Sequence, residues 1–185
     1  MSVFSTLYTF WHLYGSDIQN GAVVLSAVAA FLVIRDTRAT ARRRGTLDLI
    51  LHQESDRELI EARDGFTALK DGTTKISSFG VPAQRNSPEA RHLKKVLNLH
   101  ELTAVAIQER VIDECVYRRW FNGTYIADYE ATKAFIEAVR KSYGNEAVFS
   151  EFEKTALRWK NDQSWGAEPN WVRRKIDAVK AIIQA

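Results

Sequence analysis

An uncharged and almost wholly apolar run occupies residues 21–34, and a cluster of arginines follows it directly. A helix needs about 20 apolar residues to cross the hydrocarbon core of a bilayer. The run falls short of this length, but residues 18–20 extend it with uncharged side chains that a helix tolerates at headgroup depth. We therefore expect an N-terminal transmembrane helix, anchored in membrane lipid by Ile18, Gly21, Leu25, Phe31, Leu32 and Ile34.

Basic residues flank this run on one side only. Asp17 is the only charged residue before Arg35, whereas residues 35–44 hold five arginines against one aspartate, Asp36. A cleaved signal peptide would carry its positive charge before the run. Since the cytoplasmic flanks of spanning helices are rich in Lys and Arg, we expect a single-pass protein of the bacterial inner membrane with its N-terminus outside. The juxtamembrane basic residues, which also attract anionic lipid, are Arg35, Arg38, Arg42, Arg43 and Arg44.

Two alternatives stay open for the N-terminal region. Short apolar runs also occur as buried helices of soluble proteins, although a soluble core gives no reason for the one-sided arginines. Residues 3–14 are rich in aromatic side chains, which favour the membrane interface. This segment forms either a helix on the outer surface or an extension of a long tilted span.

The remainder of the chain has the composition of a helical globular domain. Apolar residues make up 45% and charged residues 26% of the 185-residue sequence, and the low content of Gly and Pro favours helices. Cys115 is the single cysteine, which excludes an internal disulfide and indicates a reducing compartment. The positive net charge resides in residues 35–44, so we expect no nucleic-acid partner.

These patterns predict an all-α fold, with the N-terminal transmembrane helix followed by a cytoplasmic helical bundle of about five or six helices. Ser55 begins a Ser-x-x-Glu capping box, and Ser87 precedes Pro88 as a helix N-cap. The predicted regions are an outer segment and anchor at residues 1–35, a juxtamembrane helical region at 36–72, a loop at 73–87 and the bundle domain at 88–185.

Within the bundle, hydrophobic periodicity predicts helices over residues 88–107, 113–122, 128–143 and 145–160 and a basic, aromatic helix from residue 169 or 170. The short second helix would turn Cys115, Val116 and Trp120 inward and end at Gly123.

Four pieces of the central region occur in a recognisable order and spacing: Leu-Asn-Leu-His-Glu at residues 97–101, Val-Ile-Asp-Glu at 111–114, Tyr-Arg-Arg-Trp at 117–120, and Phe152-Glu153 with Trp159. In this pattern the chain resembles an uncharacterised bacterial and phage family, the domain of unknown function numbered four-seven-six-zero. The resemblance implies a prokaryotic helical domain, often membrane-anchored, without a known activity. The sequence departs from the family pattern at Ala106 and Arg110, where glycine is usual.

Two histidines were candidates for metal binding. His100 and Glu101 begin like a zinc-protease helix, but Ala104 occupies the place of the second ligand, so a hydrogen-bonded core role is favoured for His100. His52, with Glu54 and Asp56, lies in a stretch that is typical of a solvated surface. We therefore expect no metal and no cofactor.

The carboxylates offer a second kind of chemistry. Glu101, Asp113, Glu114 and Asp128 could converge for acid and base catalysis, but helix N-termini and a Glu114–Arg118 pair account for most of them. Glu101 lies between two apolar stripes, which predicts a buried polar network of Glu101, His100, Arg118 and Arg119.

Three functional hypotheses follow from the sequence. The first is a non-enzymatic, membrane-anchored module that binds an unknown protein partner. The second is a membrane effector in host–phage conflict that forms homo-oligomers in the bilayer, since Gly21, Ser26 and Ala30 allow close helix approach. The third is a hydrolase or nuclease that uses the carboxylates.

Overall fold

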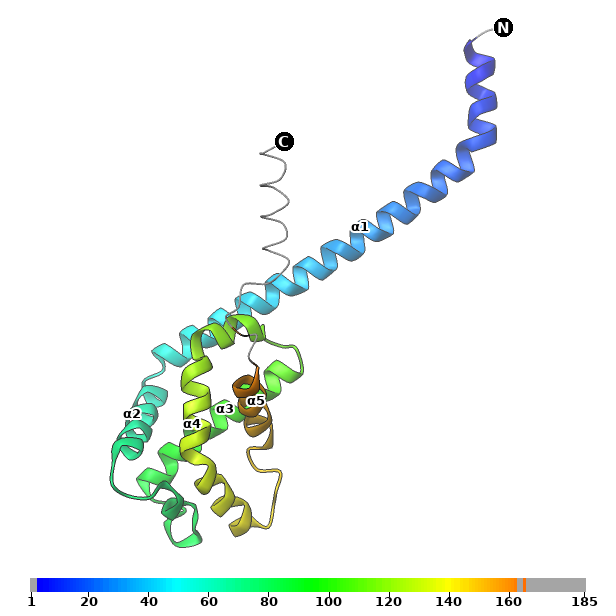
Figure 1. Ribbon diagram of the computed structural model, residues 1–185. Helices are drawn as coiled ribbons and strands as arrows, with labels where there is room; N and C mark the ends of the chain where they lie inside the picture. The colour runs from blue at the N-terminus through cyan, green and yellow to red at the C-terminus, as the bar shows by residue number, and fades with distance from the viewer. Residues whose placement is uncertain (1–2, 163–164, 166–185) are drawn as a thin grey trace, which may run out of the picture.

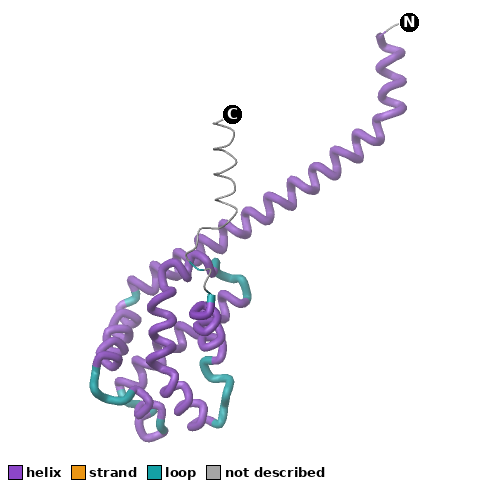
Figure 2. Tube along the Cα trace, in the orientation of Figure 1, coloured by secondary structure: helices purple, strands orange, loops and turns teal. Residues whose placement is uncertain are grey.

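The computed structural model describes residues 3–162 and Trp165, with side chains from Gln19 onward. This part of the chain contains α-helices and two short 3-10 helices and no strand (Figure 2). The all-α prediction is confirmed, whereas the predicted helix from residue 169 lies outside the described residues. The elements are α1 Val3–Ser55, α2 Arg57–Asp71, η1 Ile76–Gly80, η2 Pro82–Gln84, α3 Pro88–Gln108, α4 Glu114–Tyr143 and α5 Ser150–Asn161.

Helix α1 is a long rod that leaves the bundle and carries the N-terminus far from it (Figure 1). Its C-terminal end packs against the other helices through Thr46, Ile50 and Gln53, which are buried and share one helix face. Thr46 Oγ1 accepts a hydrogen bond of 2.7 Å from the backbone N–H of Asp113. The bundle is therefore fixed to the last third of α1, and the predicted boundary at residue 35 falls inside one continuous helix.

The apolar run of residues 21–34 is exposed along its whole length. Its larger side chains have exposed fractions between 51% for Val28 and 72% for Leu25. Among the residues that the structure describes, no helix is both long enough and apolar enough to cross a membrane. The side chain of Ile18 lies outside the described part.

The break between α1 and α2 depends on one aspartate. Asp56 Oδ1 accepts hydrogen bonds from the backbone N–H groups of Glu58 at 2.9 Å and Leu59 at 3.1 Å, so Asp56 is the N-cap of α2. The capping box predicted at Ser55 is therefore wrong by one residue. The Ser55 hydroxyl instead donates back to the Leu51 carbonyl at 2.8 Å, which closes the last turn of α1.

The segment predicted as a loop at residues 73–87 contains η1 and η2, and η1 packs against α4. Gly80 makes this approach feasible, because a Cβ there would lie 2.7 Å from the Ala138 Cβ and 3.1 Å from the Phe135 carbonyl oxygen. Ser87 then caps α3 as predicted, since its Oγ accepts a hydrogen bond of 3.1 Å from the Ala90 N–H.

Helix α4 is one continuous helix across the predicted break at Gly123. Its buried stripe begins with Tyr117 and Phe121, so the prediction that Cys115 and Trp120 point inward is wrong, and both are exposed. Glycine in a helix interior costs about 1 kcal/mol, which the packing of the long stripe outweighs. The helix ends at Gly144, whose φ of 61° places it in the left-handed region, as predicted.

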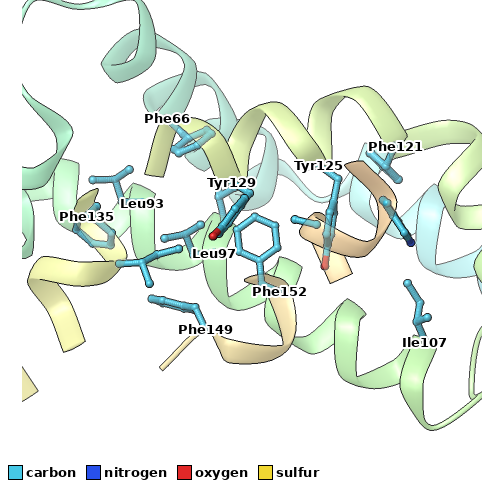
Figure 3. Close-up of a cluster of buried hydrophobic side chains, with 14 of the residues drawn as sticks. Phe66, Leu93, Leu97, Ile107, Phe121, Tyr125, Tyr129, Phe135, Phe149 and Phe152 are labelled. Carbon is cyan, nitrogen blue, oxygen red and sulfur yellow. The ribbon is translucent and has the colours of Figure 1, made fainter. Parts of the chain in front are cut away.

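The core lies where α2, α3, α4 and α5 meet, and it is rich in aromatic rings (Figure 3). Phe152 of α5 is fully buried and makes edge contacts with Tyr125 and Tyr129 of α4 at ring distances of 4.8 and 5.7 Å. Trp159 extends the same face of α5, and Phe149, the residue before this helix, is buried in the same core. The predicted apolar stripe of this helix is thus confirmed.

Candidate functional site

The most polar part of the core is a cluster of three side chains from three helices. Asp128 of α4 accepts hydrogen bonds from Lys70 Nζ of α2 at 2.7 Å and from His100 Nε2 of α3 at 3.0 Å. The side chains of Asp128 and His100 are 5% and 7% exposed, and that of Lys70 is 24% exposed. The cluster therefore joins α2, α3 and α4 inside the bundle.

Helical spacing positions His100 in this cluster. It continues the buried stripe of α3, one turn after Val96 and Leu97. Its ring stacks on Phe152 with a centroid distance of 4.8 Å, and the Tyr125 hydroxyl donates to the His100 carbonyl at 3.0 Å. The structure thus places His100 among the core residues, with an aromatic ring on its face and a carboxylate at its edge.

The electrostatics of the cluster favour a structural role. Burial raises the pKa of Asp128, but the hydrogen bonds and charges of His100 and Lys70 outweigh it, so this pKa lies below its usual 3.8. Asp128 is thus ionised at neutral pH and accepts a hydrogen bond from the His100 Nε2–H. His100 Nδ1 is sealed from solvent without a hydrogen-bond partner. Because neither ring nitrogen is free to meet a substrate, the histidine is not arranged as a general base.

A cavity of about 290 Å³ lies beside the cluster, and its lining includes Lys70, His100 and Asp128. Aromatic walls come from Phe66, Phe121 and the 64% exposed Trp120. This volume is near the lower end of ordinary ligand pockets, which begin at roughly 300 Å³. Asp128 already accepts hydrogen bonds from Lys70 and His100, and Glu54 pairs with Arg63, so the cavity offers no unpaired acidic group for catalysis.

The carboxylates that the sequence offered for catalysis do not meet. Asp113 caps α4, with Oδ1 accepting from the Val116 N–H at 3.2 Å. Glu114 accepts from Trp159 Nε1 at 2.6 Å and pairs with Arg158 at 2.7 Å rather than with Arg118. Glu101 accepts hydrogen bonds from the backbone at the start of α5, and Asp128 belongs to the cluster above. The four groups serve four separate structural purposes.

The predicted polar network is divided into separate parts. Arg118 is buried and joins α4 to the end of α5, donating to Asp162 Oδ2 at 2.6 Å, the Trp159 carbonyl at 2.8 Å and Asn122 Oδ1 at 2.9 Å. It shares no hydrogen bond with Glu101, which was predicted to pair with Arg118 or Arg119 and instead bonds the backbone of α5. Arg119, the next residue of α4, is exposed.

The structure also locates the residues considered for metal binding. His52 lies 3.7 Å from Asp56, and Glu54 pairs with Arg63 at 2.9 Å. In the described ranges, residues 3–162 and 165, no group of three or more His, Cys, Asp or Glu side chains is placed to hold a metal ion.

Lys70 was not singled out from the sequence, although it completes the buried cluster. The available signal was its position one turn after Phe66 on the buried face of α2. A lysine at the end of a helix is usually solvated. Lys70 pairs with Asp128 only because the fold brings this buried aspartate of α4 next to it.

The fold and the site define a class of protein. It is a small helical bundle at the end of a long N-terminal helix, with a buried Lys-Asp-His cluster. The chain belongs to the family described as Domain of unknown function (DUF4760), whose pattern matches residues 20–159. The predicted resemblance is confirmed, and the matched region includes both the apolar run and the bundle. No curated protein and no solved structure matches the chain.

Proposed function

We propose that the protein is a membrane-anchored helical module, in which α1 holds the bundle at the cytoplasmic surface and the bundle acts by binding a protein partner. One observation carries this proposal. The apolar side chains of residues 21–34 are exposed on a helix that projects away from the bundle (Figure 1). So large an apolar surface is unstable in water and requires a cover.

The distribution of the apolar side chains favours lipid as that cover. Successive helical residues are rotated by about 100°, so the exposed side chains point in every direction around α1. A protein groove covers one face of a helix, whereas lipid covers all of them. The exposed large residues are Val23, Val24, Leu25, Val28, Phe31, Leu32, Val33 and Ile34.

The length of the run sets how it would lie in a bilayer. At about 1.5 Å per residue, residues 21–34 cover roughly 21 Å, less than the hydrocarbon thickness of about 30 Å. Residues 18–20 add roughly 4–5 Å. A helix this short is accommodated by local thinning of the bilayer and by flanking side chains that reach the headgroups. Arg35 and Arg38, both exposed, stand at the cytoplasmic end of the run.

Binding rather than catalysis is supported by the polar core. Asp128, His100 and Lys70 satisfy one another, and the remaining candidate carboxylates are used in caps and ion pairs. The bundle surface instead carries large apolar side chains that suit a protein contact, among them Leu102 and Trp120 at 65% and 64% exposure. These observations support an interaction module over a hydrolase.

Vesicle flotation with charge-insertion variants tests the proposal. The double variant Leu25→Arg/Leu32→Arg places two cations in the run, each costing about 2.5–3.5 kcal/mol at the centre of a bilayer. We expect the wild type to float with phosphatidylcholine vesicles and this variant to remain at the bottom. Leu47→Arg/Leu51→Arg is the matched control, because Leu47 and Leu51 are exposed leucines of α1 beyond the run. Equal flotation of both variants, or none of the wild type, contradicts the proposal.

A further inference from the structure

An open cleft of about 620 Å³ lies at the end of the bundle from which α1 departs. Its walls come from the turn between α3 and α4 and from the exposed side of α5, and Arg42 of α1 completes it. Two contacts fix this turn to α1: the 2.7 Å hydrogen bond from the Asp113 N–H to Thr46 and a 3.4 Å contact between Arg43 and Asp113. The cleft therefore keeps a set position relative to the rod.

Four cations line the cleft, and two of them lack an ion pair with any described residue. Lys154 pairs with Glu151 at 2.6 Å and Arg158 pairs with Glu114 at 2.7 Å. Arg42 and Arg110 have no such partner, so they present unneutralised guanidinium groups. The three acidic lining residues already have partners. Asp113 contacts Arg43 and caps α4, and Glu114 and Glu151 pair with Arg158 and Lys154. The uncompensated charge of the cleft is thus positive.

The backbone of Arg110 is strained, although its side chain has no ion pair with a described residue that would require this conformation. Its φ of 56° lies in the left-handed region, where a residue other than Gly costs roughly 1 kcal/mol. The surrounding turn is well formed, because the Val111 N–H donates to the Ala106 carbonyl at 2.9 Å. Glycine would fit this turn without strain, so a positively charged side chain is held here at a cost.

If α1 is anchored, the cleft lies just beyond the lipid headgroups and within reach of them. Arg42 follows Ile34 by eight residues, or roughly 12 Å of helix. The headgroup region is about 5–8 Å thick, and an extended arginine side chain reaches several ångströms towards it. In Figure 1 the turn between α3 and α4 lies beside the point where α1 leaves the bundle.

We propose that this cleft binds the phosphate of an anionic phospholipid headgroup, with Arg42 and Arg110 as its main donors. Guanidinium groups bind phosphate oxygens in pairs of hydrogen bonds, and the planar fork suits a fixed cleft. Such a contact orients the bundle against the membrane as well as tethering it. The inference rests on the proposed membrane anchor.

Cys115 provides the readout, because it is exposed and lines the same cleft. The full chain is placed in vesicles of phosphatidylcholine, or of phosphatidylcholine and phosphatidylglycerol in equal amounts. Alkylation of Cys115 by uncharged N-ethylmaleimide is followed by mass spectrometry. We expect alkylation about fivefold slower with phosphatidylglycerol, the factor that corresponds to about 1 kcal/mol for a basic residue near an anionic surface.

The decisive variant is Arg42→Gln/Arg110→Gly, in which glycine fits the left-handed backbone so that folding is not at risk. We expect it to lose the difference between the two vesicle types. The control Arg91→Gln/Arg119→Gln removes the same charge from exposed positions outside the cleft and should keep the difference. Equal rates for the wild type in both vesicles, or an unchanged difference in the cleft variant, overturn the inference.

Two further measurements distinguish a failure of the headgroup site from a failure of the membrane anchor. Glycerol 3-phosphate added to phosphatidylcholine vesicles should leave the Cys115 rate unchanged. Equal protection by this soluble ester would mean that the cleft takes free phosphate esters, which contradicts the lipid assignment. Co-sedimentation with pure phosphatidylcholine reports the anchor alone. If the wild type does not co-sediment, the result contradicts both the anchor and the headgroup site. If it co-sediments but Cys115 is alkylated at equal rates in the two vesicle types, the result contradicts the headgroup site only.

Discussion

The carboxylate of Glu101 in α3 caps the N-terminus of α5, where Oε2 accepts a hydrogen bond of 2.7 Å from the backbone N–H of Phe152. Oε1 accepts a second, of 3.3 Å, from the N–H of Glu151. Phe149, the residue before α5, is left-handed with φ 57° and gives no side-chain cap. A residue from another helix therefore satisfies the first N–H groups of α5 and places a negative charge at the positive end of its dipole.

We expect Glu101→Ala to lower the free energy of unfolding by about 1–2 kcal/mol, the usual cost of losing an N-cap acceptor with its charge. Urea denaturation of the full chain in detergent micelles measures this change. Glu101→Gln keeps one acceptor oxygen, so its free energy of unfolding should lie between those of Glu101→Ala and the wild type. Glu109→Ala, at an exposed position just after α3, should stay within about 0.5 kcal/mol of the wild type. Equal losses for Glu101→Ala and Glu109→Ala would argue against the remote cap.

Asp128→Asn removes the anion that Lys70 and His100 share, and we expect a loss of about 3 kcal/mol at neutral pH. The folded-state pKa of Asp128 lies below the ordinary 3.8, so its contribution is complete above that value. It is lost as the pH falls through the folded-state pKa. The difference between wild type and variant should therefore be constant from neutral pH to about pH 4 and shrink in stronger acid.

Denaturation curves across this range check the prediction, with Asp64→Asn, at an exposed position of α2, as the control. A difference that does not change with pH would show that Asp128 contributes through packing rather than charge.

Arg118→Lys tests whether the geometry of the guanidinium matters at the end of α5. Arg118 reaches three acceptors on α4 and near the end of α5, and its guanidinium carbon lies 4.1 Å from the Trp165 ring centroid. A lysine keeps the charge but cannot make this fork, so we expect a loss of about 2 kcal/mol in thermal or urea unfolding. Arg119→Lys, at the exposed neighbour, should have almost no effect. Similar stabilities for the two variants would contradict the account.

Much of the fold could be predicted from the sequence because its cues are local. The Ser87 cap, the Gly144 stop and the apolar stripes of α3 and α5 each depend on residues within a few turns. The errors arose where tertiary packing decides. Gly123 looked like a helix end, but the buried stripe from Tyr117 onward keeps α4 intact. The contact of Gly80 with α4 could not be read from a segment without periodicity.

The candidate site was less predictable, since its members come from distant parts of the chain. Helical periodicity was enough to place His100 in the core. The partners of His100 and Glu101 were not accessible, because Asp128 lies on α4 and the N–H of Phe152 belongs to α5. Sequence charge alone also cannot show that Arg42 and Arg110 line one cleft, which requires the turn between α3 and α4 to pack on α1.

The single cysteine gives a direct test of orientation. Cys115 is exposed on the bundle, so a membrane-impermeant maleimide should label it in lysed cells and fail to label it in intact cells. In a Cys115→Ser background, Ser5→Cys before the apolar run should show the opposite pattern, with labelling of intact cells. Labelling of Cys115 in intact cells would place the bundle outside and reverse the orientation inferred from the arginines.

Separation of a detergent-free lysate by ultracentrifugation tests the membrane anchor most directly. The exposed apolar run predicts that the native protein sediments with membranes, withstands a high-salt or carbonate wash and is released by detergent. Release by salt alone would leave only electrostatic attachment through the arginines. Native protein that stays in the supernatant would contradict the anchor and with it the proposed function.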